Sequence, residues 1–264
     1  MLGYASIVGF PFKISNHILG VIGIYASKSD AFRNDELTLL IQLADDLAYG
    51  IVALRIRRER DKVQRDLQKS YKKLERVLEE TVDSLSSTVE KRDPYTSGHE
   101  HRVTTLACAI AHKLSVPKEI MECIRIAGLL HDIGKIAVPI EILSKPGKLT
   151  EPEFQIIQTH SRVGYDILKP IEFPWPVQQV VLQHHEKMNG SGYPDGILGK
   201  DILLASRILT VADVVEAITS HRPYRPAFDM NTALLEISNN KNILYDPEVV
   251  NACITLLTEN GFKL

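Results

Sequence analysis

A histidine and an aspartate, His131 and Asp132, stand side by side at the end of an apolar run in this 264-residue chain. Burying an imidazole and a carboxylate is costly unless something binds them. Five histidines and two aspartates lie near expected helix ends or on apolar helical faces: His99, His131, His160, His184, His185, Asp132 and Asp213. Imidazole and carboxylate donors without thiolate favour iron, manganese or zinc over a structural zinc site. The sequence therefore predicts bound divalent metal, and two ions fit this donor set better than one.

The competing interpretation is that these are ordinary core residues. Any one of the histidines alone could be a buried side chain with satisfied hydrogen bonds. A metal site explains the whole set better, because an unpartnered carboxylate such as Asp213 in an apolar helical run is expensive to bury. Three further histidines belong to no motif, and we expect them to be surface or satisfied core residues: His17, His101 and His112.

Helical periodicity dominates the chain beyond Pro94. Apolar residues recur there at helical spacing, and no run alternates with the period of two that a half-buried strand shows. Thr150 followed by Glu153 is a capping-box signal, and Asp246 before Pro247 is an N-cap signal. We predict an all-α domain with helices over 97–114, 118–131, 151–168, 175–186, 201–220, 229–239 and 246–258.

The N-terminal segment, residues 1–54, has a different pattern. Two strand-like runs, 5–10 and 18–25, flank a hairpin signal at Asn16-His17. A helix with one apolar face follows them. Two strands and one helix leave a sheet edge and a sheet face uncovered, so this segment resembles a piece of a larger α/β fold.

Residues 55–92 are highly charged and contain neither glycine nor proline. Apolar residues recur there at steps of three or four: Leu67, Tyr71, Leu74, Leu78, Val82, Leu85 and Val89. Such spacing over about three heptads is typical of a parallel coiled coil between two copies. The alternative is one amphipathic helix packed on its own domain. We predict a homodimer through residues 63–92, because the preceding run Arg55–Arg60 is too charged to be buried.

Composition excludes several classes of protein. Hydrophobic residues make up 44% and charged residues 24%, as in soluble globular proteins. A net charge of −2 gives no electrostatic case for binding nucleic acid or an acidic membrane, although local cations could hold a small anion. No apolar run approaches the roughly 18 residues of a membrane span, and no signal peptide is evident. We expect a cytoplasmic protein without direct membrane contact, whose three cysteines are reduced packing residues.

Several motifs combine into a family resemblance: Arg92-Asp-Pro-Tyr-Thr-Ser-Gly-His99 with Arg102, His131-Asp-Ile-Gly-Lys135, His184-His-Glu186, Gly192-Tyr-Pro194, and Ala212-Asp213 with the run from Ser220 to Pro226. Together they resemble the HD-GYP domain, a branch of the HD phosphohydrolase superfamily, over about residues 82–260. The resemblance implies an HD-type helical fold. It also implies hydrolysis of the bacterial second messenger cyclic di-GMP to linear pGpG, and often on to GMP.

The resemblance also implies a set of metal ligands with Asp132 as the bridge between two ions. One ion would be held by His99, His131, Asp132 and Asp213, and the other by Asp132, His160, His184 and His185. Some family members hold a third metal through a glutamate four residues before the first histidine, but this chain has Tyr95 there, which favours two. Three residues after Asp213, where the family usually has aspartate, this chain has Glu216. This is a smaller change than the one at Tyr95, and we do not expect it to abolish activity. Iron is the expected metal, with manganese as the alternative.

Substrate contacts are predicted for four residues. Lys135, about one helical turn beyond His131, offers a cation to a non-bridging phosphate oxygen. By resemblance, Arg222 and Arg225 grip the phosphates or a guanine edge, and Tyr193 faces the substrate from a glycine-rich loop. Each could instead be an ordinary surface group. Together with the bridging ligand Asp132, Lys135 makes up the predicted catalytic pair.

The N-terminal segment is similar to the C-terminal part of a GAF domain, a sensory fold, in Pro11, Leu19–Tyr25, Phe32 and Glu36–Ala44. The predicted order is therefore a partial sensory fragment (1–54), a coiled-coil helix (55–92) and a phosphohydrolase domain (93–264). Two functional alternatives stay open. One is an inactive domain that binds a nucleotide or a protein partner, and the other is a hydrolase for another cyclic nucleotide, such as cyclic GMP-AMP.

Overall fold

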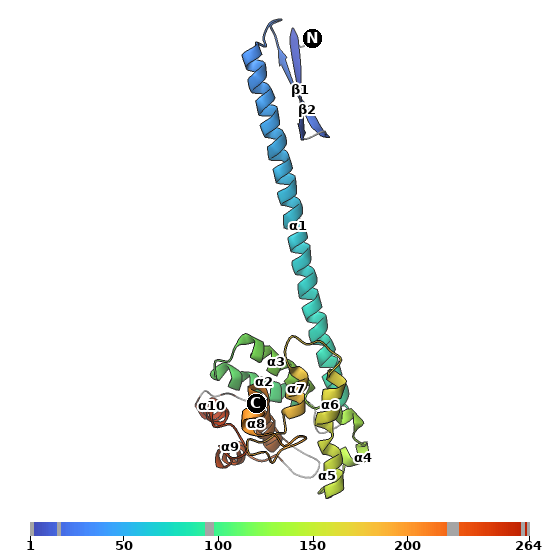
Figure 1. Cartoon of the computed structure of the whole chain (residues 1–264), viewed down its shortest axis with the longest axis vertical. Helices are drawn as coiled ribbons and strands as arrows, with labels where there is room; N and C mark the ends of the chain where they lie inside the picture. The colour runs from blue at the N-terminus through green and yellow to red at the C-terminus, as the bar shows by residue number, and fades with distance from the viewer. Residues whose placement is uncertain (1–2, 15–16, 93–97, 221–226, 260–261, 263–264) are drawn as a thin grey trace. The chain divides into compact units, whose positions relative to one another are not determined.

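The computed structural model of the chain (Figure 1) describes residues 3–14, 17–92, 98–220, 227–259 and 262. These residues are mainly helical, with one two-stranded sheet, which confirms the main feature of the predicted fold class. Two compact units divide the chain, Met1–Arg76 and Val77–Leu264.

The N-terminal unit consists of a hairpin and most of a long helix. Strand β1 (Ser6–Ile14) pairs antiparallel with β2 (His17–Ala26), as the alternating runs predict. Helix α1 (Asn34–Glu90) follows and crosses the predicted border at position 54 without a break. Ile7 and Val21 on the sheet are more than half exposed. The sheet thus keeps an uncovered apolar surface, as expected of a partial fold, and the likeness to a GAF domain stays a prediction.

Helix α1 contains an 18-residue window with a mean hydropathy of 1.6. By length and composition alone this helix could cross a membrane, although core helices of soluble proteins pass the same test. The sequence predicts no segment long enough to span a membrane when only uninterrupted apolar runs are considered. Asp45 and Asp46 interrupt the apolar part of α1, which explains the difference.

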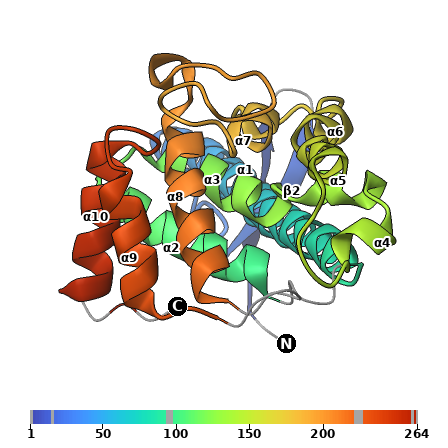
Figure 2. The ribbon, with the colours of Figure 1, turned by 90° about the horizontal axis from the view of Figure 1, so that it is seen from below.

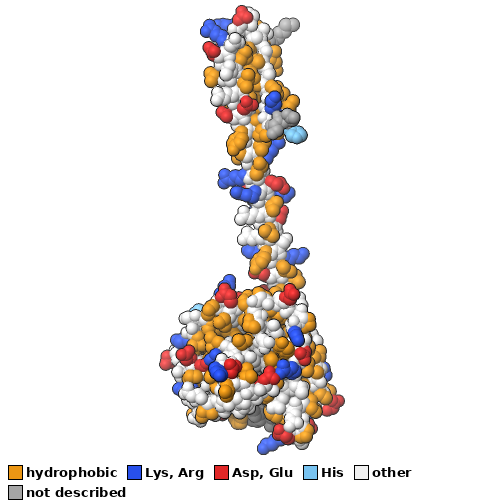
Figure 3. Space-filling model, in the orientation of Figure 1, with side chains coloured by type: hydrophobic (Ala, Val, Ile, Leu, Met, Phe, Trp, Pro, Cys, Tyr) orange, Lys and Arg blue, Asp and Glu red, His pale blue; other side chains and the backbone are white. Residues whose placement is uncertain are grey.

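The predicted heptad stripe on α1 divides between two environments. Val82 and Val89 are buried in the core of the C-terminal unit. Leu67, Tyr71 and Leu74 are instead 61–69% exposed. Figure 3 shows that apolar side chains lie on the surface of this helix. The C-terminal end of α1 therefore packs on its own domain, as the alternative to a coiled coil between two copies predicts. The upstream positions are free to pair, and the coiled coil stays a prediction for them.

The C-terminal unit is a set of helices around one apolar core. Helices α2, α3 and α8 pack together, and Figure 2 shows α9 and α10 on one side of α8 and α5 and α6 on the other. The elements are α2 (His99–Lys113), α3 (Lys118–Leu130), η1 (Ile133–Ala137), α4 (Ile140–Leu143), α5 (Glu151–Gln158), α6 (His160–Leu168), α7 (Val177–Gln183), η2 (Gly199–Asp201), α8 (Leu204–Thr219), α9 (Met230–Asn239) and α10 (Pro247–Thr258).

Two of the predicted helix starts, those of α5 and α10, are confirmed by their caps. Asp246 accepts hydrogen bonds from the backbone N–H groups of Glu248 and Val249, at the start of α10. Glu153 accepts one from the backbone N–H of Thr150 at 2.7 Å, as a capping box requires. These local signals work because the first N–H groups of a helix have no partner within it.

The predicted single helix over 151–168 is wrong at Thr159, where α5 ends and α6 begins. The Thr159 N–H bonds to the carbonyl of Ile156, three residues back, so the α-helical ladder is broken there. The break brings the His160 carbonyl against Gly134, where an added Cβ would lie 1.9 Å from that oxygen. Gly134 thus permits the close approach of η1 to α6.

Candidate metal centre

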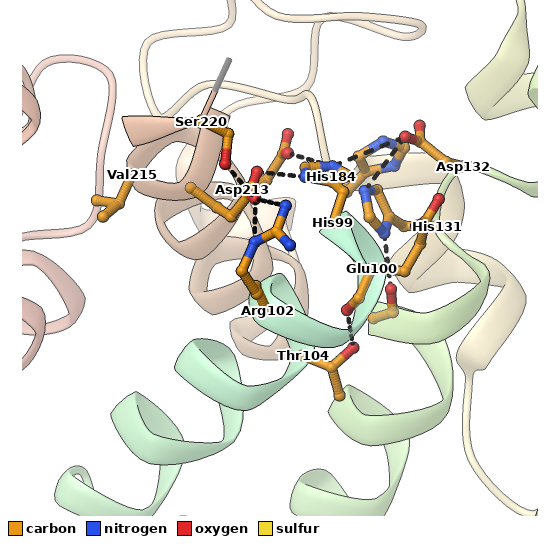
Figure 4. Close-up of polar contacts among 12 residues, drawn as sticks. His99, Glu100, Arg102, Thr104, His131, Asp132, His184, Asp213, Val215 and Ser220 are labelled. Atoms are coloured by element: carbon orange, nitrogen blue, oxygen red, sulfur yellow. Dashed lines mark hydrogen bonds and ion pairs between the residues drawn. The ribbon is translucent and has the colours of Figure 1, made fainter. Parts of the chain in front are cut away.

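All seven predicted ligands come together inside the C-terminal unit, and Figure 4 shows five of them. They form three overlapping groups whose ligand atoms lie within 4.8 Å of one another: His99 with His131 and Asp213; His131 with Asp132 and His184; and His160 with His184 and His185. Since the groups share members, the seven side chains make one continuous cluster of donors.

Converging helix ends bring these donors together. His99 and His160 are the first residues of α2 and α6, and His131 and His184 directly follow α3 and α7. Asp213 projects from the middle of α8, which packs against α2, α3 and α7. The apolar faces of these helices form the surrounding core, so folding alone places the polar ends in one buried location.

Three imidazoles are oriented by the same local hydrogen bond. The Nδ1 atoms of His131, His160 and His184 each lie 2.6–2.7 Å from a backbone carbonyl oxygen three residues earlier; these oxygens belong to Gly128, Ile157 and Val181. A carbonyl oxygen only accepts, so each Nδ1 carries the proton and each Nε2 keeps its lone pair. The nitrogen left for a metal is therefore Nε2 in all three rings.

The donor geometry fits two divalent ions around Asp132. His131 Nε2 is buried and has no hydrogen-bond partner among the described residues, a costly state that a cation would relieve. Asp132 Oδ2 lies 3.6 Å from that nitrogen and 3.9 Å from His99 Nε2. Its other oxygen, Oδ1, lies 3.4 Å from His160 Nε2. The two oxygens of one carboxylate thus face different imidazoles.

The protonation states at Asp132 and His184 suit cation binding. Burial opposes ionisation of Asp132, but Lys135 and the imidazoles of His131 and His160 hold its pKa well below its usual range. Lys135 Nζ lies 2.5 Å from Asp132 Oδ2. Burial, reinforced by the neighbouring imidazoles, lowers the pKa of His184 to about 3. At neutral pH Asp132 is charged and His184 is neutral, the forms that bind metal.

His99 is held by a carboxylate rather than by a carbonyl. Its Nδ1 donates to Glu216, and its Nε2 lies 3.3 Å from Asp213 Oδ1. Although burial lowers it, these two carboxylates raise the pKa of His99 to about 9. A divalent ion at this position would take the place of the proton on Nε2.

Of the predicted substrate residues, Tyr193 and Lys135 lie beside the cluster. The Tyr193 ring is 4.7 Å from the His185 ring, centroid to centroid. Its loop is held by Glu186, whose Oε1 accepts from the backbone N–H groups of Asp195 and Gly196. Arg222, Arg225 and Tyr95 lie outside the described residues, so their predicted roles and the count of metals stay predictions.

Sequence reasoning missed the roles of Glu186 and Glu216. Glu186 directly follows two predicted ligands, His184 and His185, and this position in the sequence could have predicted a supporting role. Glu216 stood out only as a departure from the family pattern. Its partner Arg102 is 114 positions away, a pairing that no local spacing reveals.

Comparison with known proteins identifies relatives of the C-terminal part of this chain. Residues 83–249 match the HD domain family. The cyclic di-GMP phosphodiesterase response regulator RpfG of Xanthomonas campestris is 40% identical over 187 residues, 70% of this chain and 50% of that protein. The 3'3'-cGAMP-specific phosphodiesterase 3 of Vibrio cholerae is 39% identical over 171 residues, 65% of this chain and 37% of that protein. A cyclic di-GMP phosphodiesterase of Thermotoga maritima is 37% identical over 191 residues, 72% and 52% of the two chains.

The solved structure of an HDG"Y"P protein from Bdellovibrio bacteriovorus aligns with a TM-score of 0.52 and 19% identity. The alignment covers 60% of this chain and 51% of the Bdellovibrio chain. At this identity the likeness shows the fold alone. The present chain spans between 37% and 52% of the length of the three curated relatives above. On the match over residues 83–249, this chain belongs to the HD domain family.

Proposed function

We propose that this chain is a metal-dependent phosphodiesterase that hydrolyses cyclic di-GMP to linear pGpG. The observation that carries the proposal is the buried donor cluster, in which the two oxygens of Asp132 face different imidazoles. Relatives named cyclic di-GMP phosphodiesterases support the substrate class. A cytoplasmic location, where a nucleotide messenger is available, belongs to the same proposal.

Two divalent ions, iron or manganese, would supply a water of lowered pKa and neutralise charge that develops on phosphorus. Asp132 would hold both ions, with His99, His131 and Asp213 on one side and His160, His184 and His185 on the other. Lys135 would bind a non-bridging phosphate oxygen and orient the scissile bond. Tyr193, Arg222 and Arg225 would hold the nucleotide beside it.

The test is turnover by protein loaded anaerobically with Fe(II) or Mn(II), with products separated by chromatography. Cyclic di-GMP should give pGpG, and Lys135→Ala should lower the rate about 10²–10³-fold, the usual effect of removing one preorganised electrostatic contact. The variant should keep its metal, because Lys135 is not among the seven ligands and the imidazoles that also lower the pKa of Asp132 remain in place.

The exposed residue Lys148 provides the control, since Lys148→Ala should leave turnover unchanged. No turnover of cyclic di-GMP by metal-loaded wild-type protein would reject the proposal. A second candidate substrate, 3'3'-cGAMP, is favoured by the relative of that specificity. Running both dinucleotides in parallel decides between them by the ratio of kcat/KM.

We also propose that the exposed part of the α1 stripe pairs two copies of the chain. Replacing Leu67 and Leu74 together by serine should weaken the dimer at least about 100-fold, because each buried leucine contributes about 1.5–3 kcal/mol. Sedimentation equilibrium measures this directly against the 29.6 kDa mass of one chain.

The matched control is the double change Lys62→Ser and Lys69→Ser. These lysines have the same seven-residue spacing, are exposed, and lie on the opposite face of the helix. The control protein should stay dimeric. Wild-type protein that sediments as a monomer at every micromolar concentration would contradict the pairing.

A further inference from the structure

Glu216 is a buried carboxylate that links one metal donor to two other side chains. Its side chain is 1% exposed, and one oxygen accepts from His99 Nδ1. The other oxygen lies 2.7 Å from Arg102 Nε, 2.6 Å from Arg102 Nη2 and 2.6 Å from Ser220 Oγ. Figure 4 shows Arg102 and Ser220 close to Asp213 and His99.

The partner of His99 differs from the partners of three other imidazoles in the cluster. Three other imidazoles donate Nδ1–H to a carbonyl three residues earlier, which lies in α3 for His131, in α5 for His160 and in α7 for His184. His99 is the first residue of α2, and its Nδ1 bonds to a carboxylate instead of a carbonyl. That carboxylate comes from another element, because Glu216 lies on α8, one turn after Asp213.

The contact fixes both the tautomer and the direction of the His99 ring. A carboxylate accepting at Nδ1 leaves Nε2 as the ligand atom and makes the imidazole a better donor to a cation. Nε2 then faces Asp213 Oδ1 at 3.3 Å, on the side of His131. His160 and His185 belong to another group of donors, which they form with His184.

We propose that Glu216 is a positioning residue for one of the two metal sites only, the one formed with His99, His131 and Asp213. Arg102 and Ser220 hold Glu216 in place, so its oxygen stays directed at His99. This assignment rests on the proposed two-metal centre. It goes beyond the seven ligands by making the two sites unequal in their dependence on one distant side chain.

The test measures Mn(II) binding to metal-free protein, by anaerobic calorimetry and by electron paramagnetic resonance. Glu216→Ala should weaken one Mn(II) site about 10–100-fold, the usual range for an outer ligand contact, and leave the other unchanged. With enough Mn(II) to fill both wild-type sites but not the weakened one, the spectrum should change from a coupled pair in the wild type to an isolated ion in the variant. Glu216→Asp keeps the carboxylate and should recover most of the lost affinity.

The variant should remain folded, because Glu216 lines a cavity of about 470 Å³ with Arg102, Ser220 and Met230. Shortening the Glu216 side chain enlarges this cavity, and water can fill the added space. Circular dichroism checks the fold, and Glu172→Ala, at an exposed glutamate, is the matched control with wild-type binding.

Each outcome of the test has a distinct meaning. Loss of affinity at one site, with recovery by aspartate, supports the assignment. Unchanged binding at both sites overturns it, and equal weakening of both sites also overturns it, because that marks a general structural role. Failure of the wild-type protein to bind two Mn(II) ions rejects the two-metal centre itself, which the unmodified protein reveals before any variant is compared.

Discussion

Replacing Asp132 by alanine is expected to reduce binding at both metal sites together and to lower phosphodiesterase activity at least about 10³-fold. Removing a contact outside the ligand shell typically costs about 10–100-fold in metal affinity or activity. The loss here should be larger, because Asp132 itself would bind both ions. Its oxygens lie 3.6 Å from His131 Nε2 and 3.4 Å from His160 Nε2. Metal content after anaerobic loading, measured with the rate of product formation, checks the result.

Two further variants make that result specific. Asp132→Asn keeps the shape of the side chain and removes its charge, and it should lose metal as the alanine variant does. Asp166→Ala, at an exposed aspartate of α6, should bind metal and turn over substrate normally. Two bound metals in Asp132→Ala, with undiminished activity, would rule out Asp132 as the bridge.

The second large effect is expected from Gly134→Ala, which should lower the free energy of unfolding by at least about 3 kcal/mol or prevent folding. Overpacking a core typically costs about 1–3 kcal/mol, and more where the obstacle cannot move. The added Cβ would lie 1.9 Å from the His160 carbonyl oxygen and 2.6 Å from the Gly164 backbone nitrogen. Both are backbone atoms, so no change of rotamer relieves the overlap.

The single tryptophan, Trp175, lies against the core of the C-terminal unit, so its fluorescence during urea unfolding measures this loss. Gly50→Ala is the matched control. An added Cβ at Gly50 meets nothing within 4 Å, and alanine is the better helix former, so this change should leave the Trp175 transition where it is. An unchanged unfolding midpoint in Gly134→Ala would contradict the close approach of η1 to α6.

The helical elements were predictable because their signals are local. Helix α10 begins where the sequence places an N-cap aspartate before proline, and α5 begins at a capping-box threonine. Such signals act within one helical turn and need no tertiary contact. The break at Thr159 was not predictable in this way, because the apolar periodicity continues through it. It is stabilised by the approach of Gly134 from another element.

The stripe on α1 shows the same limit in a different form. Its spacing indicates an apolar face but does not say what covers that face at each position. Val82 and Val89 are buried by the core of the C-terminal unit, whereas Leu67 and Leu74 are left exposed. Periodicity alone cannot separate packing within one chain from pairing between two chains, because both bury residues at the same helical spacing.

By itself the sequence determined the types of the donors and their positions at helix ends, because burying imidazole and carboxylate groups in apolar runs is unfavourable without a partner. Only the tertiary structure decided how they meet. Asp132 directs its two oxygens at different imidazoles, and His99 depends on Glu216, 117 positions away. These contacts join elements that come together only when the apolar helix faces pack, so no pattern along the chain could specify them.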